Sequence, residues 1–342
     1  MKALTVTPAV AGSGEVRDVA PIDEPGVVEV RGVAVGVCGT DREILRGDLG
    51  EAPPGDEYLV LGHESLGRVT ADPSGTFTPG DLVVGIVRRP DPVPCANCAA
   101  GEWDMCRNGQ YTEHGIKGLH GFARERYRLD PAHAVRLDPA LESVGVLLEP
   151  ATIVAKVWEH IERIGARAVF APQTVVVTGA GPVGLLAALL GVQRGLDVHV
   201  LDQVTTGPKP GLVADLGATY HASPPALAAD IVIECTGVPS VVFGAVGRLA
   251  PDGIACITGM SGLGQPIELD GGGLSRALVT GNKVVFGSIN ANRRHYEQAA
   301  MALAGAELGW LERLITRRVP LAVAAEALRA QPDDVKVVVE LG

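Results

Sequence analysis

The sequence predicts an α/β protein of two domains, one of which is built around a doubly wound parallel sheet. Three observations support this prediction. The chain has 342 residues, which is more than one hydrophobic core usually organises. Residues 173–202 run through a strand, a glycine-rich turn, a helix and a second strand. Residues 1–148, in contrast, contain many short strands punctuated by Gly, Pro and Asp and no long helix, which favours a compact barrel-like domain.

The first domain is expected to cover residues 1–148 and to regain the end of the chain. Its clearest strand segments are residues 27–37, 58–61, 64–69 and 82–87. A helix rich in Leu, Val and Ala is predicted between Leu141 and Ile164, as a bridge between the two domains. Amphipathic helices follow in residues 291–342, and a final strand at Val335–Leu341 could return to the first domain.

The glycine-rich turn has the spacing G-x-G-x-x-G, in the stretch Gly179-Ala180-Gly181-Pro182-Val183-Gly184. In such a turn Gly179 permits the tight bend, Gly181 lets a pyrophosphate approach the backbone, and Gly184 lets the helix pack on the strand. The free N–H groups of the first helical turn then face the phosphates. The alternative is a purely structural glycine turn, but the flanking strand and helix favour dinucleotide binding. We therefore expect the whole turn, Pro182 and Val183 included, to contact a dinucleotide.

The second strand of this unit, residues 197–201, leads to Asp202. A carboxylate there can accept hydrogen bonds from the adenosine ribose and would repel a 2′-phosphate, so NAD is favoured over NADP. No arginine lies between Asp202 and Gly211, and Lys209 is the only cation in that stretch.

The nucleotide domain is expected to span residues 149–290. Further β-branched runs at residues 231–233, 254–257 and 284–286 each lead to a glycine. Strands that end in glycine are expected where the backbone comes close to a bound dinucleotide. Thr236 and Gly237, which follow the first of these runs, are therefore predicted cofactor contacts.

Composition and charge exclude several classes of function. The chain is 46% hydrophobic and 20% charged, with a formal charge of −11. No basic stripe is present to displace counterions from nucleic acid, and no apolar run approaches the length of a membrane span. The first residues read as a strand and not as a signal peptide, so we expect a cytoplasmic protein. In that compartment clustered cysteines are metal ligands more often than disulfides.

Thiol, imidazole and carboxylate side chains before the glycine-rich turn form a pattern typical of a metal site. Cys38 follows one predicted strand, His63 and Glu64 lie at the end of another, and Glu149 lies inside an apolar run. These are zinc's preferred ligand types, and three protein ligands with an open position characterise a catalytic zinc. Taken singly, each residue has an ordinary structural interpretation. Together, before a nucleotide-binding pattern, they indicate a metal centre.

The chain resembles the zinc-dependent medium-chain alcohol dehydrogenases. The blocks that carry the resemblance are G-V-C-G-T-D at residues 36–41, G-H-E at 62–64 and G-A-G-P-V-G at 179–184. Narrower features resemble the microbial glucose dehydrogenases of that superfamily. These features are C-G-T-D-R-E at 38–43, V-R-R-P at 87–90, Y-T-E-H-G-I at 111–116, H-G-F at 120–122, L-E-P at 148–150, N-K at 282–283 and G-S-I-N at 287–290. The resemblance covers nearly the whole chain and implies a GroES-like catalytic domain beside a Rossmann domain.

The resemblance also implies roles for single residues at the catalytic metal. Cys38 and His63 would bind a catalytic zinc. Glu64 would be a ligand or a close partner of the ligands, and Glu149 a further ligand, directly or through water. Thr40 would hydrogen-bond the reacting hydroxyl group, and Asp41 would orient His63.

The same resemblance implies which residues meet the substrate. Glu113 and Asn290 would contact the other hydroxyl groups of a sugar, with Asn290 also close to the cofactor. Glu64 and Glu149 would border the same substrate.

A second cysteine cluster resembles the structural zinc lobe of the same superfamily. Cys95, Cys98 and Cys106 have the spacing C-x2-C-x7-C, and Pro92 stands where the family has its first cysteine. Proline cannot bind zinc, but the neighbouring Asp91 could supply the fourth ligand of a structural zinc. The alternative is a zinc-free lobe with three reduced thiols. A zinc with four protein ligands would only hold the lobe together, since it leaves no open position.

The function implied is a zinc-dependent oxidoreductase that transfers a hydride from a sugar hydroxyl to NAD, with D-glucose as the first candidate and a lactone as product. The alternative is a dehydrogenase of another polyol, such as an inositol or an aminocyclitol, because Val87 and Ile153 are apolar where some relatives carry polar groups. A remote alternative is a non-catalytic nucleotide-binding protein. Relatives are homodimers or homotetramers, and the apolar strand at residues 284–288 could pair across such an interface.

Overall fold

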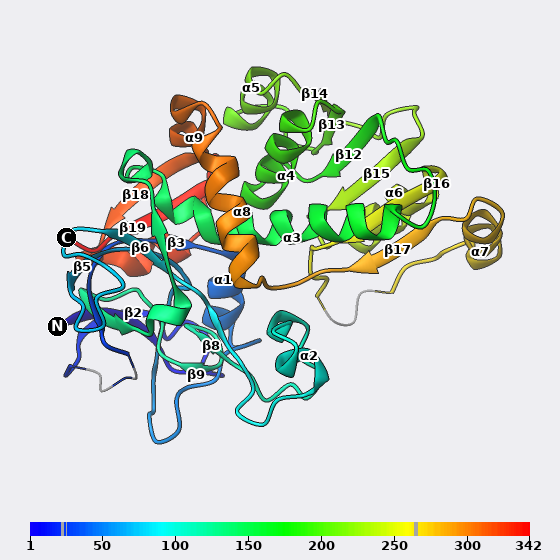
Figure 1. The fold of residues 1–342 in the computed structure, drawn as a ribbon. Coiled ribbons are helices and arrows are strands. Elements are labelled where there is room, and N and C mark those ends of the chain that lie inside the picture. The colour runs from blue at the N-terminus through cyan, green and yellow to red at the C-terminus, as the bar shows by residue number, and fades with distance from the viewer. Residues whose placement is uncertain (22–23, 25, 263–265) are drawn as a thin grey trace. The chain divides into compact units, whose positions relative to one another are not determined.

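The computed structural model describes residues 1–21, 24, 26–262 and 266–342, and Figure 1 shows its helices and strands. The chain divides into two compact units, one formed by Met1–Glu149 with Asn290–Gly342 and the other by Pro150–Ile289. The α/β class is confirmed. The expected boundaries place Glu149 and Asn290 in the nucleotide domain, whereas both residues fall in the first unit. The Asn290 side chain bonds to Glu113 of the same unit.

The first unit contains a seven-stranded sheet of order β11-β6-β5-β3-β19-β18, with β10 paired to β3. Its strands are β3 (Val28–Val37), β5 (Glu64–Ala71), β6 (Leu82–Gly85), β10 (Arg126–Leu129), β11 (Ala134–Leu137), β18 (Ile315–Pro320) and β19 (Lys336–Glu340). Two smaller sheets have the orders β2-β1-β4 and β7-β8-β9. Their strands are β1 (Lys2–Val6), β2 (Glu15–Asp18), β4 (Leu59–Val60), β7 (Arg88–Arg89), β8 (Thr112–His114) and β9 (Gly118–Leu119).

The helices of the first unit are short. They are α1 (Gly39–Arg46), α2 (Ala96–Ala99), α8 (Arg293–Ala304) and α9 (Leu308–Leu314), with the 3-10 segments η1 (Trp103–Met105), η2 (Pro131–His133), η3 (Pro139–Leu141), η4 (Gly145–Leu147) and η5 (Leu321–Leu328). The strands of the first unit confirm the many short strands that the sequence predicts for residues 1–148.

The last strand of the chain joins the first unit, as the sequence predicts. β19 runs antiparallel to β3, with Val338 opposite Gly36, and parallel to β18 on its other side. The residues Val337, Val338 and Val339 are fully buried or nearly so. An all-valine run of this kind suits a central strand that is covered on both faces.

The second unit is a six-stranded parallel sheet of order β14-β13-β12-β15-β16-β17 with helices on it. The strands are β12 (Thr174–Thr178), β13 (Asp197–Leu201), β14 (Thr219–His221), β15 (Ala229–Glu234), β16 (Leu249–Ile257) and β17 (Val284–Gly287). The helices are α3 (Leu148–Gly165), α4 (Pro182–Gln193), α5 (Pro208–Asp215), α6 (Pro239–Gly247) and α7 (Gly271–Thr280). Helix α4 packs on β12 and β13, and α6 packs on β15 and β16 (Figure 1). The order reverses beside β12, as in a doubly wound sheet.

The glycine-rich turn between β12 and α4 is tight for a steric reason. Gly179 has a φ of 92°, which a side chain would strain. A Cβ atom at Gly184 would overlap the carbonyl oxygen of Gly179, so the first turn of α4 can lie against the turn only without one. Gly181 is the N-cap of α4 and Pro182 its first residue, where the missing N–H costs nothing.

The predicted bridging helix begins later than its apolar run. Residues Pro139–Leu141 and Gly145–Leu147 form 3-10 segments, and α3 starts only at Leu148. Among the described residues, no helix is both long enough and apolar enough to cross a bilayer.

Substitution of Val338 by Ala tests the place of β19 in the core. Val338 is 0% exposed, so we expect Val338→Ala to cost about 2 kcal/mol of stability, the range of large-to-small core substitutions. The urea midpoint should fall, and amide hydrogens of β3 should exchange faster. Val323→Ala is the control, because Val323 is 43% exposed and should leave both unchanged. Equal midpoints for the two variants would contradict a central position of β19.

Candidate functional site

The ends of two strands in the first unit bring Cys38, His63 and Glu64 together. Cys38 follows β3 and is the N-cap of α1, where the Asp41 carboxylate accepts a hydrogen bond of 2.8 Å from its main-chain N–H. His63 directly precedes β5, and Glu64 begins it. One ligand atom from each of the three side chains lies within 4.8 Å of the other two.

Backbone geometry makes room for the buried carboxylate. β3 pairs with β5, and Gly36 lies opposite Glu64 in that pairing. A Cβ atom at Gly36 would overlap the Glu64 carboxylate, so only glycine leaves the space that this side chain fills. Glu64 is 1% exposed and His63 is 4% exposed, so both are removed from water.

The three side chains fit a zinc ion. The donor set is a thiol, an imidazole and a carboxylate, which are zinc's preferred ligands. His63 Nδ1 and Asp41 Oδ1 are buried 3.6 Å apart, and neither has a hydrogen-bond partner among the described residues. Burial opposes the charged imidazolium, but the Asp41 carboxylate outweighs it, so the pKa of His63 is raised well above its ordinary value. A carboxylate beside the imidazole of a ligand is the arrangement that orients metal-bound histidines.

Glu149 and Thr40 lie near this set but are not part of it. Thr40 Oγ1 is 3.9 Å from Cys38 Sγ. Glu149 lies in the first turn of α3, outside the group of three mutually close ligand atoms. Burial raises the pKa of Glu149 to about 7; the His63 charge opposes this rise and the Glu64 charge adds to it.

Lys336 is a member of the site that the sequence reasoning missed. Its ammonium group forms an ion pair with Glu64 and donates a hydrogen bond of 3.2 Å to the carbonyl of Val37. The side chain is 1% exposed and comes from β19. The only signal in the sequence is a lysine at the head of the apolar run 337–339. The Lys336 ammonium group compensates the buried Glu64 carboxylate, because a buried charge needs a partner of opposite charge.

The cysteine lobe brings its three thiols within ligand distance of one another. Cys95 Sγ and Cys98 Sγ are 3.7 Å apart, and Cys106 Sγ is 3.9 Å from Asp91 Oδ2. Asp91 is not in the group of mutually close ligand atoms, and its other oxygen accepts from the N–H of Val93. Main-chain N–H groups, that of Arg107 first, lower the pKa of Cys95 to about 6, which favours the thiolate form that binds metals.

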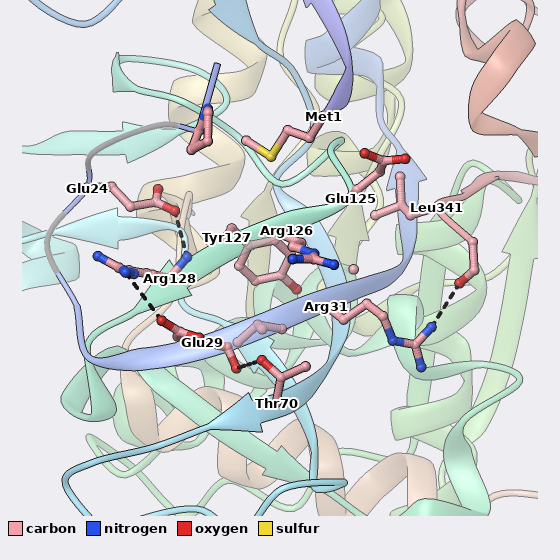
Figure 2. Close-up of a pocket in the computed structure, with 14 residues that line it drawn as sticks. Met1, Glu24, Glu29, Arg31, Thr70, Glu125, Arg126, Tyr127, Arg128 and Leu341 are labelled. Atoms are coloured by element: carbon pink, nitrogen blue, oxygen red, sulfur yellow. Dashed lines mark hydrogen bonds and ion pairs between the residues drawn. The ribbon is translucent and has the colours of Figure 1, made fainter. Parts of the chain in front are cut away.

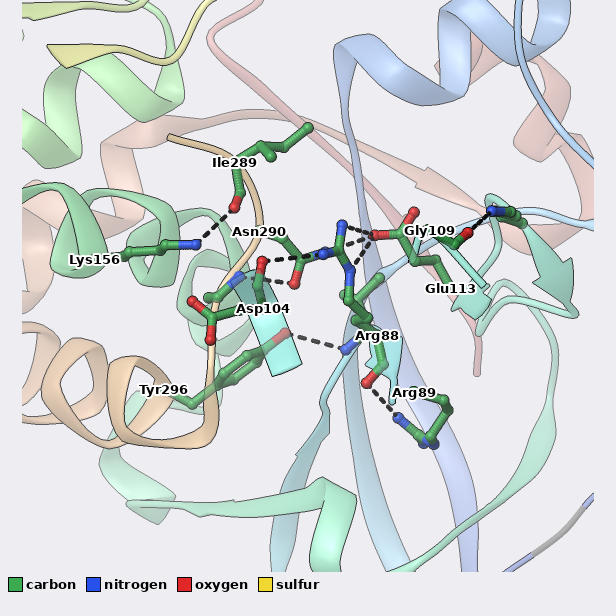
Figure 3. Close-up of polar contacts among 12 residues, drawn as sticks. Arg88, Arg89, Asp104, Gly109, Glu113, Lys156, Ile289, Asn290 and Tyr296 are labelled. Carbon is green, nitrogen blue, oxygen red and sulfur yellow. Dashed lines mark hydrogen bonds and ion pairs between the residues drawn. The ribbon is translucent and has the colours of Figure 1, made fainter. Parts of the chain in front are cut away.

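The two residues that the resemblance links to sugar hydroxyls lie side by side (Figure 3). Asn290 Nδ2 donates a hydrogen bond of 2.6 Å to Glu113 Oε1. The same oxygen accepts from Nε and Nη2 of Arg88, at 3.0 and 2.9 Å. Burial is the main reason that the pKa of Tyr296 is raised well above its ordinary value, and the charges of Glu149 and Glu113 add to that rise. The hydroxyl of that tyrosine accepts from the main-chain N–H of Val87.

In the second unit, Asp202 lies directly after β13 and beside the glycine-rich turn. Its Oδ2 accepts from the N–H of Ala180 at 2.8 Å, and its Oδ1 accepts from the N–H of Val204 at 2.9 Å. Lys209 Nζ lies 3.0 Å from Oδ2. Partial burial works to raise the pKa of Asp202, but these donors outweigh it and the pKa is lowered. The carboxylate is therefore charged and held against the turn.

Glu234, the last residue of β15, organises the turn that holds Thr236 and Gly237. It is 1% exposed, and its carboxylate accepts from Thr178 Oγ1, from the Thr236 N–H at 2.7 Å and from the Gly237 N–H at 3.1 Å. The sequence reasoning missed this residue as well. A carboxylate at the end of the apolar run 231–233 was the available signal. It fixes the backbone of both predicted cofactor contacts.

Two of the cavities in the described part of the chain bear on the location of the site, one in each unit. One of about 260 Å³ in the second unit is lined by Thr178, Leu201, Pro224, Leu227, Val241 and other mostly apolar residues, next to the strand that carries Asp202. Its apolar walls suit a flat ring. A larger cavity of about 1030 Å³ in the first unit, shown in Figure 2, has none of the predicted site residues in its lining. Arg128 and Glu29 of that lining are paired with each other at 3.2 Å.

Nearly the whole chain is similar to known proteins. Residues 24–139 match the alcohol dehydrogenase GroES-like domain, and residues 142–341 match the glucose dehydrogenase C-terminus. A glucose 1-dehydrogenase of Thermoproteus tenax is 42% identical over 100% of this chain and 99% of its own, and one of Methanocella arvoryzae is 38% identical over 100% of both. The glucose dehydrogenase of Haloferax mediterranei, solved in complex with NADP, Zn and gluconolactone, superposes with a TM-score of 0.93 at 30% identity, over 100% of this chain and 99% of its own.

Substitution of Lys336 by Met tests the compensation of Glu64. Breaking a buried ion pair leaves an uncompensated charge, so we expect Lys336→Met to cost about 3–5 kcal/mol in protein stripped of metal. Added zinc should recover part of that loss, since a cation among Cys38, His63 and Glu64 offsets the same carboxylate. The measurement is the thermal midpoint with and without zinc.

The control for this test is Lys2→Met. Lys2 pairs with Asp18 at 3.6 Å, and their side chains are 50% and 78% exposed. An exposed pair of this kind contributes up to about 1 kcal/mol. If Lys336→Met were no more harmful than Lys2→Met, Lys336 would not be holding Glu64.

Proposed function

We propose that this member of the glucose dehydrogenase branch of the zinc-dependent medium-chain alcohol dehydrogenases oxidises an aldose at its anomeric carbon. NAD would be the oxidant and a lactone the product. D-Glucose is the first candidate substrate. The observation that carries the proposal is the buried group of Cys38, His63 and Glu64, whose ligand atoms lie within 4.8 Å of one another. It supports an enzyme over a nucleotide-binding protein without chemistry, because such a protein has no use for a compensated metal set.

The proposed catalytic residues act around the reacting hydroxyl group. Cys38, His63 and Glu64 would hold the zinc, with Glu149 as a further ligand, direct or through water. Zinc, when bound, supplies a Lewis acid that makes loss of a hydroxyl proton easier near neutral pH. Asp41 would keep His63 in orientation. Thr40 Oγ1 would accept a hydrogen bond from the reacting hydroxyl group and lie in the proton exit path, taking up that proton only as it passes its own to water. Lys336 would hold Glu64 in place through their ion pair.

The proposed cofactor site lies in the second unit. Gly179, Gly181, Pro182, Val183 and Gly184 would hold the pyrophosphate at the N-terminus of α4. Thr236 and Gly237, held by Glu234, would border the same dinucleotide, and the apolar cavity beside Leu201 would take the adenine. The nicotinamide, when bound, accepts the hydride.

NAD is the proposed cofactor, although the Haloferax mediterranei enzyme was solved with NADP. The proposal rests on Asp202, which is charged and held by main-chain donors beside the glycine-rich turn, where the adenosine ribose would lie. Lys209 beside it is a cation of the kind that pairs with a phosphate. The preference for NAD therefore depends on which of these two side chains faces the ribose.

Glu113 and Asn290 are the proposed contacts to the remaining sugar hydroxyls. The mutual hydrogen bond of their side chains supports a shared role. A second candidate substrate class, an inositol or another polyol, is favoured by Val87, a buried apolar side chain in the bend between β6 and β7. Such a residue offers no hydrogen bond to a sugar hydroxyl.

Two further proposals concern metal content and assembly. Cys95, Cys98 and Cys106 would bind a structural zinc with Asp91 as fourth ligand, which the 3.9 Å between Asp91 and Cys106 supports. A homodimer or homotetramer is proposed because β17 lies at the end of its sheet. An edge strand offers unpaired N–H and C=O groups to a second copy.

Turnover with a panel of substrates tests the reaction. We expect NADH to form with D-glucose at neutral to mildly basic pH, and a zinc chelator to abolish the rate, because the catalytic metal would be removed. Parallel reactions hold NADP, other aldoses, inositols and a simple alcohol. Turnover only with another polyol would change the proposed substrate but leave the proposed reaction as it is. A rate that survives removal of all zinc would contradict the proposed mechanism.

Substitution of Asp202 tests the cofactor preference. We expect Asp202→Gly to shift the ratio of kcat/KM for NAD to that for NADP toward NADP by at least about tenfold, because removal of a like charge relieves a repulsion worth several kcal/mol. Lys209→Met is the matched variant and should shift the ratio the other way. An unchanged ratio in Asp202→Gly would show that this carboxylate does not read the ribose.

A further inference from the structure

The two carboxylate oxygens of Glu113 have different surroundings. Oε1 accepts three hydrogen bonds, two from Arg88 and one from Asn290, at 3.0, 2.9 and 2.6 Å (Figure 3). Oε2 accepts none from the described part of the chain. A carboxylate oxygen has about two lone-pair directions, so Oε1 has no capacity left for a ligand. The acceptor that remains for a substrate hydroxyl is Oε2.

Arg88 is held from several sides, so its guanidinium cannot turn without breaking contacts. It is 3% exposed. Nη1 donates a hydrogen bond of 3.1 Å to the carbonyl of Asp104, and the guanidinium carbon lies 3.6 Å from the centre of the Tyr111 ring. The edge formed by Nε and Nη2 therefore faces Glu113 in one fixed direction. Only a planar fork can make these contacts at once, and a lysine cannot.

The network closes on itself through the segment that carries Asn290. Asn292 Nδ2 donates to Asp104 Oδ1 at 2.9 Å and to the Gly101 carbonyl at 2.7 Å. Asn290 has a φ of 61°, and its Oδ1 accepts from the N–H of Ala291. Hydrogen bonds thus lead from Glu113 to Arg88, to Asp104, to Asn292 and along two residues of chain back to Asn290 and Glu113. A ring of this kind holds each member more firmly than separate pairs do.

We propose that Arg88 is a positioning residue for substrate recognition: it saturates Glu113 Oε1, fixes the carboxylate and presents Oε2 to a substrate hydroxyl other than the one that is oxidised. The proposal rests on the proposed function, since it assumes a polyhydroxylated substrate at Glu113. Asp104 belongs to the cysteine lobe, so this lobe acts as the support of the guanidinium.

The inference has a specific consequence for substrate choice. A site built to hydrogen-bond a substrate hydroxyl discriminates strongly against an analogue without it, because the acceptor is then left unpaired. A carboxylate that is free to turn loses part of this discrimination. The hydroxyl that is oxidised is not held by Glu113, so the chemical step should change less than substrate binding does.

The test uses zinc-loaded full-length Arg88→Lys, Glu113→Gln and the double variant. The substrates are the sugar that the wild type turns over fastest and its monodeoxy analogues. We expect Arg88→Lys to raise KM for the sugar by about tenfold, the size of one lost charge-assisted hydrogen bond, with kcat within about threefold and KM for NAD unchanged. Discrimination against one monodeoxy analogue should fall by a similar factor. Arg88→Lys should add nothing to Glu113→Gln, because the arginine acts through that carboxylate.

Arg294→Lys is the matched control. Arg294 pairs with Glu102 of the same lobe at 2.7 Å and is not among the described hydrogen-bonding or ion-pairing partners of Glu113, so this variant should keep the wild-type KM and discrimination. Tyr111→Leu is the second test variant in case Arg88→Lys does not fold. It removes the ring beneath the guanidinium and should raise KM in the same direction.

A crystal structure of metal-loaded Arg88→Lys without substrate separates this inference from the proposed function. We expect the Glu113 side chain to leave its present position and lose its bond to Asn290. If Glu113 and Asn290 kept their places there, the positioning role of Arg88 would be overturned, whatever the substrate is. A wild type without turnover on any sugar or polyol, with Glu113 displaced in Arg88→Lys, would instead reject the proposed function alone. Unchanged KM and discrimination in a folded, active Arg88→Lys would overturn the inference.

Discussion

The ion pair between Lys336 and Glu64 is the contact on which the proposed metal site of the first unit depends. Glu64 is 1% exposed and lies beside His63, Asp41 and the region of Glu149, so several carboxylates share a space without water. Unpaired charges in such a place cost far more than a small protein domain can tolerate. The cation comes from β19, the last strand of the chain, and Gly36 leaves the room for the carboxylate. The topology of the sheet therefore determines how the buried charge is compensated, because the pairing of β19 with β3 brings Lys336 to Glu64.

In the second unit, a buried carboxylate is compensated by hydrogen-bond donors and not by a cation. Glu234 is as deeply buried as Glu64, and its partners are the N–H groups of Thr236 and Gly237 and the hydroxyls of Thr178 and Thr236. Main-chain donors that satisfy a carboxylate also fix the backbone that supplies them. The turn after β15 is consequently held in place before any dinucleotide arrives. Asp202 is held in the same way by Ala180 and Val204, and so a preformed set of carboxylates borders the glycine-rich turn.

Local patterns in the sequence were enough to predict the parts of this protein that depend on neighbouring residues. The strand 197–201 has the same bounds in the structure, and the glycine-rich turn lies between β12 and α4 as expected. Steric demands and alternation of side chains act over a few residues, so they leave a mark that can be read directly. The start of α3 was harder, because the apolar run from Leu141 continues through 3-10 segments without a change of composition.

The contacts that sequence alone could not predict are those between distant segments. Lys336 begins a strand in which three ordinary valines follow it, and nothing nearby marks its partner. Arg88 and Glu113 are 25 residues apart, and a pair of adjacent arginines at 88 and 89 has no local signature of a buried ion pair. The resemblance to a family assigned roles to Glu113 and Asn290. It included Arg88 only as part of the V-R-R-P block and gave that arginine no role.

Three buried glutamates of this chain differ in function because their partners differ. Glu64 faces a cation and two further ligand types, Glu234 faces main-chain donors, and Glu113 faces a guanidinium on one oxygen only. A carboxylate with both oxygens satisfied by the protein can only hold structure, whereas one with a free oxygen can still bind. Similar burial therefore does not imply similar roles. The acceptors that remain unsatisfied after the fold has formed decide which of these side chains is available to a ligand. By that criterion Glu234 supports the backbone, whereas Glu113 keeps the free oxygen that its proposed role in substrate recognition requires.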